Sequence, residues 1–353
     1  RCWNRDGLIM AIERKLLGVN PSGGDKANVA DVFSTYLYDG VASGQMYVQN
    51  GIDYAADGGM LWIKSRGAVY DNFLFSTENT SANHYLRSNT TGAEDSTSLS
   101  ATWESDGFKL NANNGMSYNG ATYGTPYVSW GFKKAPKFFD VVTYTGNGTA
   151  GREIAHGLDG PVGMMIVKRT DSAGEWYVQH KDVAPNKELA LQSNSGLPTS
   201  TTNSTFNNTA AISSVFTLGN GGGTNATGGT YVAYLFADNT AEDADDQMIK
   251  CGSYTGSSSD VTVNLGWEPQ FVITKATSGT RDWVIHDSMR SMSHSNSTLL
   301  DANNSGAEEA KSYAQIKPTA SGMDVAFGNA ASNGGSGTYI YMAIRAPMMK
   351  EPD

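Results

Sequence analysis

Lysine and histidine side chains that could serve a reaction recur at matching places along the chain. Lys64, Lys168 and Lys275 each end an apolar run, and His180 and His286 lie four and three residues past a Trp. We interpret the two histidines as equivalent repeat positions, which favours a structural role because catalysis needs one unique constellation. The lysines are expected to cap or pair locally at strand ends, which contributes little where they are exposed.

Patterns typical of hydrolases are missing from the sequence. A nucleophilic serine needs a Gly-x-Ser-x-Gly turn between a strand and a helix, and no match has that context. A polysaccharide-cleaving enzyme needs two carboxylates across a cleft. The candidates for a base or a carboxylate are His156, Glu78, Asp106, Glu175 and Asp287. Nothing in the sequence pairs them, so we predict a non-enzymatic protein without a cofactor.

An acidic run at 238–246 is the one candidate for a metal site. It holds five carboxylates in nine residues, and Asp243, Asp245 and Asp246 are weak candidates for Ca²⁺, which prefers oxygen ligands. The run lacks the glycine and the terminal glutamate of an EF-hand loop, so a solvated acidic linker is the favoured interpretation. Two cysteines, Cys2 and Cys251, are too few for a disulfide framework or a Cys-based metal site.

Four aromatic residues are candidates for sugar binding. Trp103, Tyr118, Tyr123 and Trp267 lie outside the alternating apolar segments, where their rings could stack on a sugar beside Asn and Asp side chains. The favoured alternative is that they cap the cores of β-sandwiches, in which buried Trp is common.

These residues are set within a sequence that repeats about every 105 residues. Five segments recur in the same order: an opening Tyr segment, an apolar run ending in Lys, a Leu-x-x-Asn segment, a short Phe or Met segment and a closing aromatic strand. A Trp follows the second segment in two copies, and Tyr70 and Phe73 flank that position in the first. The segments lie at 36–40, 143–148 and 253–257; 60–64, 164–168 and 271–275; 86–89, 191–194 and 300–303; 107–108, 215–216 and 322–323; and 127–132, 231–236 and 339–344.

The recurring segments predict an all-β fold. They alternate apolar with small or polar residues, which is typical of half-buried strands, and Gly, Asn, Ser and Thr clusters between them indicate turns. We predict three tandem β-sandwich-like repeats at 31–135, 136–240 and 241–353. A row of sandwiches is the preferred arrangement, and a compact one with pseudo-threefold symmetry is the alternative.

Residues 1–30 are predicted to form an arm or a short helix. Leu8, Ile12 and Leu16 recur at helical spacing, which allows a helix at about 6–17. Met10 resembles a translation start, so residues 1–9 are interpreted as an upstream extension or as part of that arm.

Composition narrows the class of protein further. Charged residues are only 17% of the chain, glycines number 40, and the net charge is −10. Such a charge argues against nucleic-acid binding, which needs clustered Lys and Arg. No run of about 20 apolar residues exists, so neither a transmembrane span nor a signal peptide is expected.

The repeated motifs resemble one family of proteins. Residues 31–38, 138–148 and 231–236 are similar to structural or tail-fibre-like proteins of marine tailed phages. The resemblance covers the chain from Met10 onward and implies a component of the exterior of the virion, without catalytic residues. An appendage or fibre that contacts the host surface is the leading expectation, with capsid decoration, cement or head fibre as one alternative and a carbohydrate-binding module as another. The expected partners are other virion proteins and a host surface glycan. The chain itself is expected to form a homotrimer.

Overall fold

The computed structural model of the chain describes residues 28–41, 44–78, 84–96, 101–112, 126–197, 204–239, 246–290, 292, 295, 297–311, 313, 315–328 and 330–347. Short strands dominate, and each helix in these ranges is a single turn of three or four residues. The all-β prediction is therefore confirmed. The predicted helix at 6–17 lies outside the described residues.

The first segment, 31–135, folds into one main sheet and one small sheet. The main sheet has the order β1-β9-β3-β4-β5-β6, and the small sheet has the order β2-β8-β7. The elements from residue 29 onward are α2 (Val29–Val32), β1 (Phe33–Asp39), β2 (Gly44–Gln49), α3 (Tyr54–Asp57), β3 (Gly59–Ser65), β4 (Phe73–Ser76), β5 (His84–Arg87), β6 (Asp95–Ser96), β7 (Ala101–Glu104), β8 (Gly107–Ala112) and β9 (Pro126–Lys133).

The second segment, 136–240, has the same plan. Its main sheet has the order β10-β16-β12-β13-β14, and its small sheet pairs β11 with β15. The elements are β10 (Phe139–Thr145), β11 (Arg152–Ala155), β12 (Val162–Arg169), β13 (Trp176–His180), β14 (Leu189–Ala190), β15 (Val215–Leu218), α4 (Gly222–Asn225) and β16 (Thr230–Ala237).

The third segment, 241–353, follows the plan again. Its main sheet has the order β17-β25-β19-β20-β21-β22, and its small sheet has the order β18-β24-β23. The elements are β17 (Ile249–Thr255), β18 (Val261–Asn264), β19 (Pro269–Ala276), β20 (Trp283–Asp287), η3 (Ser288–Arg290), β21 (Ser297–Asp301), β22 (Glu309–Lys311), β23 (Ile316–Thr319), β24 (Gly322–Val325), α5 (Ala330–Asn333) and β25 (Thr338–Arg345).

The shared strand order supports the interpretation of the sequence as a triplication. In every segment the first strand pairs with the last, and the last pairs with the central strand. The opening and closing tyrosines face one another in each first–last pair, and their rings stack with centroids 5.3, 5.1 and 5.2 Å apart. These pairs are Tyr38 with Tyr127, Tyr144 with Tyr231, and Tyr254 with Tyr339.

A buried asparagine explains the Tyr-Thr-Gly motif of the second and third segments. The Oδ1 atom of Asn225 accepts from the Asn147 N–H at 2.9 Å, and that of Asn333 accepts from the Ser257 N–H at 2.8 Å. Each amide group also donates to two backbone carbonyls. The motif therefore fixes the turn after the opening strand and has a structural role.

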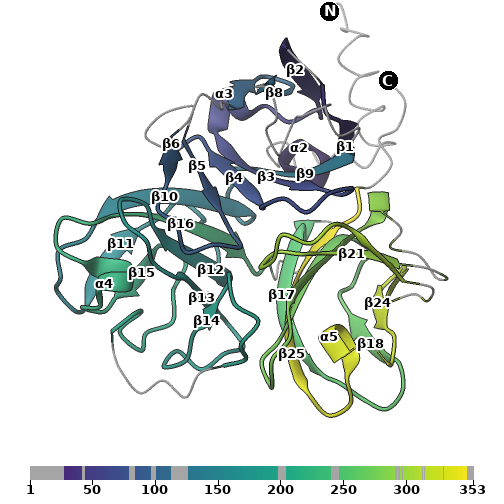
Figure 1. Cartoon of the computed structure of the whole chain (residues 1–353). Coiled ribbons are helices and arrows are strands. Elements are labelled where there is room, and N and C mark those ends of the chain that lie inside the picture. Colours follow the sequence, from purple (N-terminus) through teal and green to yellow (C-terminus); the bar gives the residue numbers. More distant parts are fainter. Residues whose placement is uncertain are drawn as a thin grey trace, which may run out of the picture.

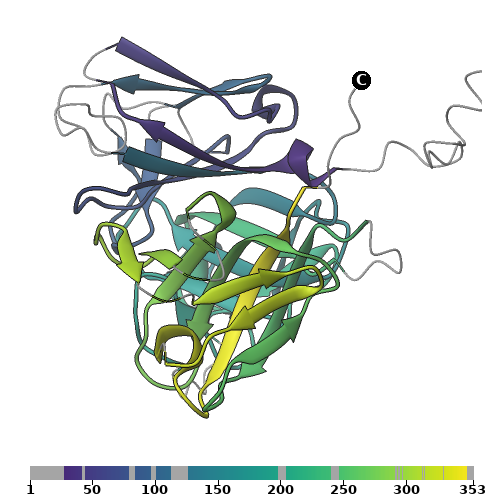
Figure 2. The same ribbon diagram turned by 90° about the vertical axis from the view of Figure 1, so that its right-hand side faces the viewer.

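The three main sheets surround one common core (Figure 1). A single hydrophobic cluster includes Trp62 and Phe132 of the first segment, Phe236 of the second, and Phe271 and Ile344 of the third. The preferred row of separate sandwiches is therefore wrong, and the compact alternative describes the molecule. Figure 2 shows the same close packing of the segments from the side.

The central strands are buried on both faces. One face of each main sheet packs into the common core, and the other packs against the small sheet of its own segment, as Leu61 and Ile63 do in the first segment. All eight residues of β19 are buried. The prediction of half-buried strands is therefore wrong for these strands, because alternation can separate two apolar environments as well as core from solvent.

Candidate functional site

The three repeated lysines are buried at the junctions between segments. The Nζ atom of Lys168 donates to the Thr91 carbonyl of the first segment at 3.4 Å, and that of Lys275 donates to the Asn194 carbonyl of the second at 2.8 Å. Lys64 donates to a carbonyl of its own segment. All three are 0% exposed, and burial lowers the pKa of each to about 8. They cap carbonyls as expected, but two of them reach across a junction, and none is exposed.

The repeated Trp position makes equivalent contacts. The indole N–H of Trp176 donates to the Thr90 carbonyl of the first segment at 3.0 Å, and that of Trp283 donates to the Ala190 carbonyl of the second at 3.1 Å. Asn72 takes this place in the first segment and donates to two carbonyls of the third, at 3.3 and 2.8 Å. Each segment thus contacts the preceding one in a closed ring.

In the second segment, the leucine of the Leu-x-x-Asn motif lies two residues earlier than predicted. Leu86 pairs with Leu74, and Leu300 pairs with Ile285, but the matching partner in the second segment is Leu189. The predicted equivalence of Leu191 with Leu86 and Leu300 is therefore wrong. Gln192, three residues after Leu189, takes the place of the predicted Asn, and its side-chain oxygen accepts from the Trp176 backbone N–H at 2.9 Å.

The two histidines are not equivalent. His180 pairs with Met164 of β12, whereas His286 pairs with Val272 of β19, one position away in the common register. Because strand side chains alternate, the two rings point to opposite faces. Burial lowers the pKa of His180 to about 4 and that of His286 to about 3. The His180 ring is neutral at pH 7, and its Nε2 atom donates to the Tyr341 carbonyl at 3.1 Å.

The candidate carboxylates lie in four different environments. Glu78 forms an ion pair with Lys134 at 3.1 Å, and Asp106 accepts hydrogen bonds from two side chains of β2. Glu175 is exposed, and Asp287 is buried against Arg290 at 2.6 Å. The structure brings no two of these four together as an acid and base pair.

The two sugar-binding candidates within the described residues, Trp103 and Trp267, lie in different segments. Trp267 is only 3% exposed and packs in the core of the third segment, which agrees with the favoured interpretation as a core residue and not with the sugar-binding alternative. Trp103 is half-buried and contacts the ring of Tyr54, with centroids 5.5 Å apart. Tyr118 and Tyr123 lie outside the described residues.

The acidic linker gives no support to a calcium site. Asp243 and Asp245 lie outside the described residues, and the Asp246 carbonyl accepts from the Asn239 side chain at 2.6 Å. Across the described part of the chain, no cluster of three or more His, Cys, Asp or Glu side chains could hold a metal ion. Cys251 is a buried free thiol.

An ion network at the junction of the third and first segments is absent from the sequence-based prediction. The Arg290 guanidinium contacts Asp287 at 2.6 Å and Glu308 at 3.1 Å, and Glu308 contacts Arg66 of the first segment at 2.8 Å. Asp287 also accepts from the Trp130 indole N–H at 2.9 Å. No motif signals this network, because its members come from opposite ends of the described chain.

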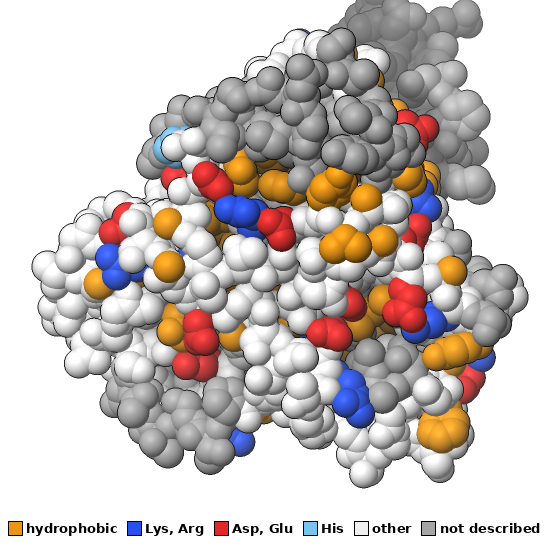
Figure 3. Space-filling model, in the orientation of Figure 1, with side chains coloured by type: hydrophobic (Ala, Val, Ile, Leu, Met, Phe, Trp, Pro, Cys, Tyr) orange, Lys and Arg blue, Asp and Glu red, His pale blue; other side chains and the backbone are white. Residues whose placement is uncertain are grey.

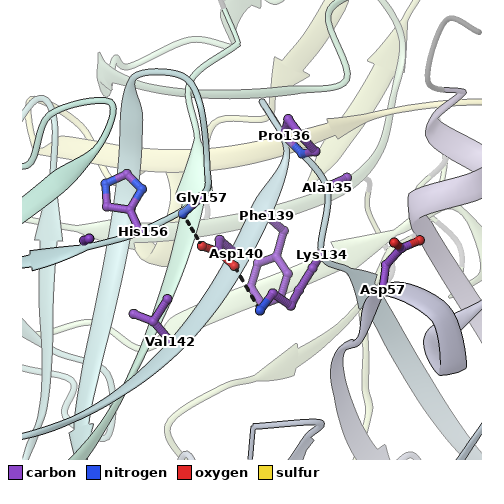
Figure 4. Close-up of a pocket in the computed structure, with 10 residues that line it drawn as sticks. Asp57, Lys134, Ala135, Pro136, Phe139, Asp140, Val142, His156 and Gly157 are labelled. Carbon is purple, nitrogen blue, oxygen red and sulfur yellow. Dashed lines mark hydrogen bonds and ion pairs between the residues drawn. The ribbon is translucent and has the colours of Figure 1, made fainter. Parts of the chain in front are cut away.

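A groove of about 520 Å³ lies between the first and second segments (Figure 4). The buried carboxylate of Asp140 is its central polar group. This carboxylate accepts from the Gly157 N–H at 2.6 Å and lies 3.5 Å from the Lys134 Nζ. Ten residues line the groove: Asp57, Lys134, Ala135, Pro136, Phe139, Asp140, Val142, Ala155, His156 and Gly157.

The groove offers no free catalytic group among its described residues. His156 donates through Nε2 to the Ile212 carbonyl at 3.0 Å and accepts at Nδ1 from the Leu158 N–H at 3.3 Å, so both ring nitrogens are occupied. Burial lowers its pKa, which keeps the ring neutral at pH 7. Asp57 pairs with Lys133 at 2.8 Å.

The model of one protein family matches residues 28–347 of the chain. The chain belongs to the family described as Domain of unknown function (DUF7483). Comparisons with curated proteins and with solved structures give no match. The DUF7483 match begins at Asn28, which caps α2, and ends two residues after β25. The DUF7483 unit is therefore the whole three-sheet assembly and not one repeat.

The surface of this DUF7483 chain carries dispersed charge. Figure 3 shows basic and acidic side chains in small mixed groups on the face that is visible. Ion pairs near the surface include Arg169 with Asp171 and Lys317 with Asp260, each at 2.7 Å. None of the helices in the described ranges has the length and hydropathy of a membrane span.

Proposed function

We propose that the chain is a non-enzymatic structural protein on the exterior of a bacteriophage particle. The observation that supports the non-enzymatic part is that the candidate catalytic groups are engaged in contacts between segments. Lys168, Lys275, His180 and Asp287 are buried, and each of them contacts another segment. A group that holds two segments together in the core has no access to a substrate.

The resemblance to tail-fibre-like phage proteins supports the virion part of the proposal. The closed three-sheet assembly fits a rigid head that is presented on a particle. The leading form of the proposal is an appendage that contacts the host surface, with other virion proteins as partners and a trimer as the oligomer. Capsid decoration is the second form, and the groove at Asp140 would then be one surface able to contact the shell.

The proposal is tested on purified virions of the phage that encodes the chain. Quantitative mass spectrometry gives the copy number per particle, and cryo-electron microscopy gives the location. A few copies at the tail vertex support the appendage, and density on every capsomer supports decoration. Absence of the chain from purified particles would overturn the proposal in both forms.

A further inference from the structure

The outer face of the small sheet in the first segment combines an exposed aromatic ring with amide side chains. Tyr47 of β2 is 42% exposed, which is high for a large aromatic residue. Gln45 and Gln49 flank it on the same face of the strand, because strand residues two apart share a face. In the register of the sheet, Tyr47 lies opposite Lys109 of β8, and Gln45 lies opposite Asn111.

Two of the three charged groups on this face pair with each other. Lys109 forms an ion pair with Glu104 at 2.7 Å. The carboxylate of Asp106 accepts from the Tyr47 hydroxyl and from the Gln49 amide, the latter at 2.9 Å. The hydrogen bond to Asp106 raises the pKa of Tyr47 to about 12, so the phenol stays neutral. The face therefore offers hydrogen-bond donors and acceptors and keeps one net negative charge, that of Asp106.

The aromatic ring is held in one place before any ligand arrives. The Lys109 ammonium lies 4.9 Å from the ring centroid, and the hydroxyl is fixed by Asp106. A fixed ring loses little conformational entropy on binding, which favours affinity. Figures 1 and 2 show β2 and β8 on the side of the first segment that faces away from the other two.

This combination occurs in one segment alone among the three equivalent small sheets. The buried pairs Val48–Phe108, Ile154–Phe216 and Val263–Met323 mark the common register. One residue before the first member of each pair, the outward position is occupied by Tyr47, Glu153 and Thr262. A tyrosine is not needed at this position to build the sheet. Its presence in the first segment points to a ligand.

We propose that the face made by Gln45, Tyr47, Gln49, Asp106 and Asn111 binds a neutral oligosaccharide. A hydroxyl-rich, uncharged chain matches the amides, which can both donate and accept hydrogen bonds. Tyr47 supplies the flat apolar surface for the C–H groups of a sugar ring, in the way that a tyrosine combines an apolar body with a polar tip. The inference rests on the proposed function, since it supplies the host-surface ligand of the appendage.

The test uses the full chain and three neutral linear hexasaccharides of different linkage: maltohexaose, cellohexaose and laminarihexaose. Binding is measured by isothermal titration calorimetry, with Tyr47→Ala as the test variant and Tyr47→Phe as the variant that keeps the ring. Glu153→Ala and Thr262→Ala are matched controls, because they change the same register position in the other segments. Circular dichroism checks that each variant is folded.

We expect at least one hexasaccharide to bind, Tyr47→Ala to weaken it by about tenfold or more, and the other variants to stay within about threefold of the parent. Equal binding by Tyr47→Ala, or no binding of any hexasaccharide, would overturn the inference. The location of the chain in virions is measured independently. A chain present in particles that binds none of the sugars refutes only the glycan site, whereas a chain absent from particles refutes the virion proposal.

Discussion

Replacement of Arg290 by Met should destabilise the fold more than any surface change. The Arg290 side chain is 0% exposed and contacts Asp287 at 2.6 Å, Glu308 at 3.1 Å and the Ile285 carbonyl at 3.2 Å. Its guanidinium also lies 5.3 Å from the ring centroid of Trp130. This junction joins the third segment to the first, which are not consecutive in the chain, so side chains must hold it closed.

The size of the effect follows from the carboxylate that is left behind. Without Arg290, Asp287 remains buried with hydrogen bonds from the Trp130 indole N–H at 2.9 Å and the Met289 N–H at 3.1 Å, and with no cation beside it. Removing one partner of a buried ion pair costs about 3–5 kcal/mol. The double change Asp287→Asn with Arg290→Met removes both charges and keeps an acceptor for the indole. It should therefore recover about 2 kcal/mol of that loss.

Urea unfolding at pH 7, followed by circular dichroism and extrapolated linearly to water, measures these free energies. The matched control is Lys317→Met, which removes an ion pair of 2.7 Å whose side chains are 27% and 48% exposed. Such surface pairs contribute up to about 1 kcal/mol. A loss below about 1 kcal/mol for Arg290→Met, or a double variant less stable than the single one, would refute the reasoning.

Four further predictions concern protonation and the turn glycines, each checked by urea unfolding of parent and variant. Burial lowers the pKa of Lys168 to about 8, so the unfolded chain binds more protons above pH 8 and stability should rise from pH 8 to 10; Lys168→Met should reduce that rise. The pKa of His180 is lowered to about 4, so stability should fall as pH drops from 6.5 to 4, and less steeply in His180→Gln. Burial raises the pKa of Asp301 to about 6, so the folded state favours the protonated carboxyl. This contribution to stability is present at low pH and is lost as pH rises through 6. Asp301→Asn should therefore be more stable than the parent at pH 7 but not at pH 4. A Cβ atom at Gly146 or Gly256 would lie 2.2 Å from a backbone carbonyl oxygen, so Ala at either position should cost about 1–3 kcal/mol, and unchanged stability would contradict the structural role of the Tyr-Thr-Gly turn.

Local patterns were enough to predict the opening, central and closing strands of each segment. Period-two alternation and β-branched or aromatic content depend on each strand alone, and the closing strands β9, β16 and β25 lie where the sequence places them. Burial on both faces was not predictable in this way. Whether the second face of a strand such as β19 meets solvent or another sheet depends on how the segments assemble.

Register errors have an equally local cause. Leu189 and Leu191 both fit a Leu-x-x-polar pattern, and only the pairing of Leu189 with Val178 selects between them. His180 and His286 differ by one position in distance from their Trp, and in a strand one position reverses the face. A small spacing difference that is harmless in aligning repeats therefore changes the environment of a side chain completely.

The candidate binding face shows which signal the sequence did contain. In the stretch 44–49, Met46 and Val48 form the apolar phase, and Tyr47 stands in the polar phase between two glutamines. Because strand side chains alternate between two faces, an aromatic residue at a polar position of the alternation is expected to be exposed. The sequence alone therefore predicts an exposed ring at Tyr47. Trp103 lies on the inward face of β7, where it contacts Tyr54. A position outside the repeated segments is therefore a weaker indication of exposure than a position on the polar face of a strand.

The closed arrangement of the three segments explains why the family unit includes all of them. The inward face of each main sheet carries large apolar side chains, such as Trp62, Ile166 and Ile273, that are covered only when the other two sheets are present. One segment alone would expose that face to water, at a cost of about 25 cal/mol for each Å² of apolar surface. The buried lysines and indole groups would also lose the carbonyls they bind across the junctions. The three main sheets are therefore one folding unit.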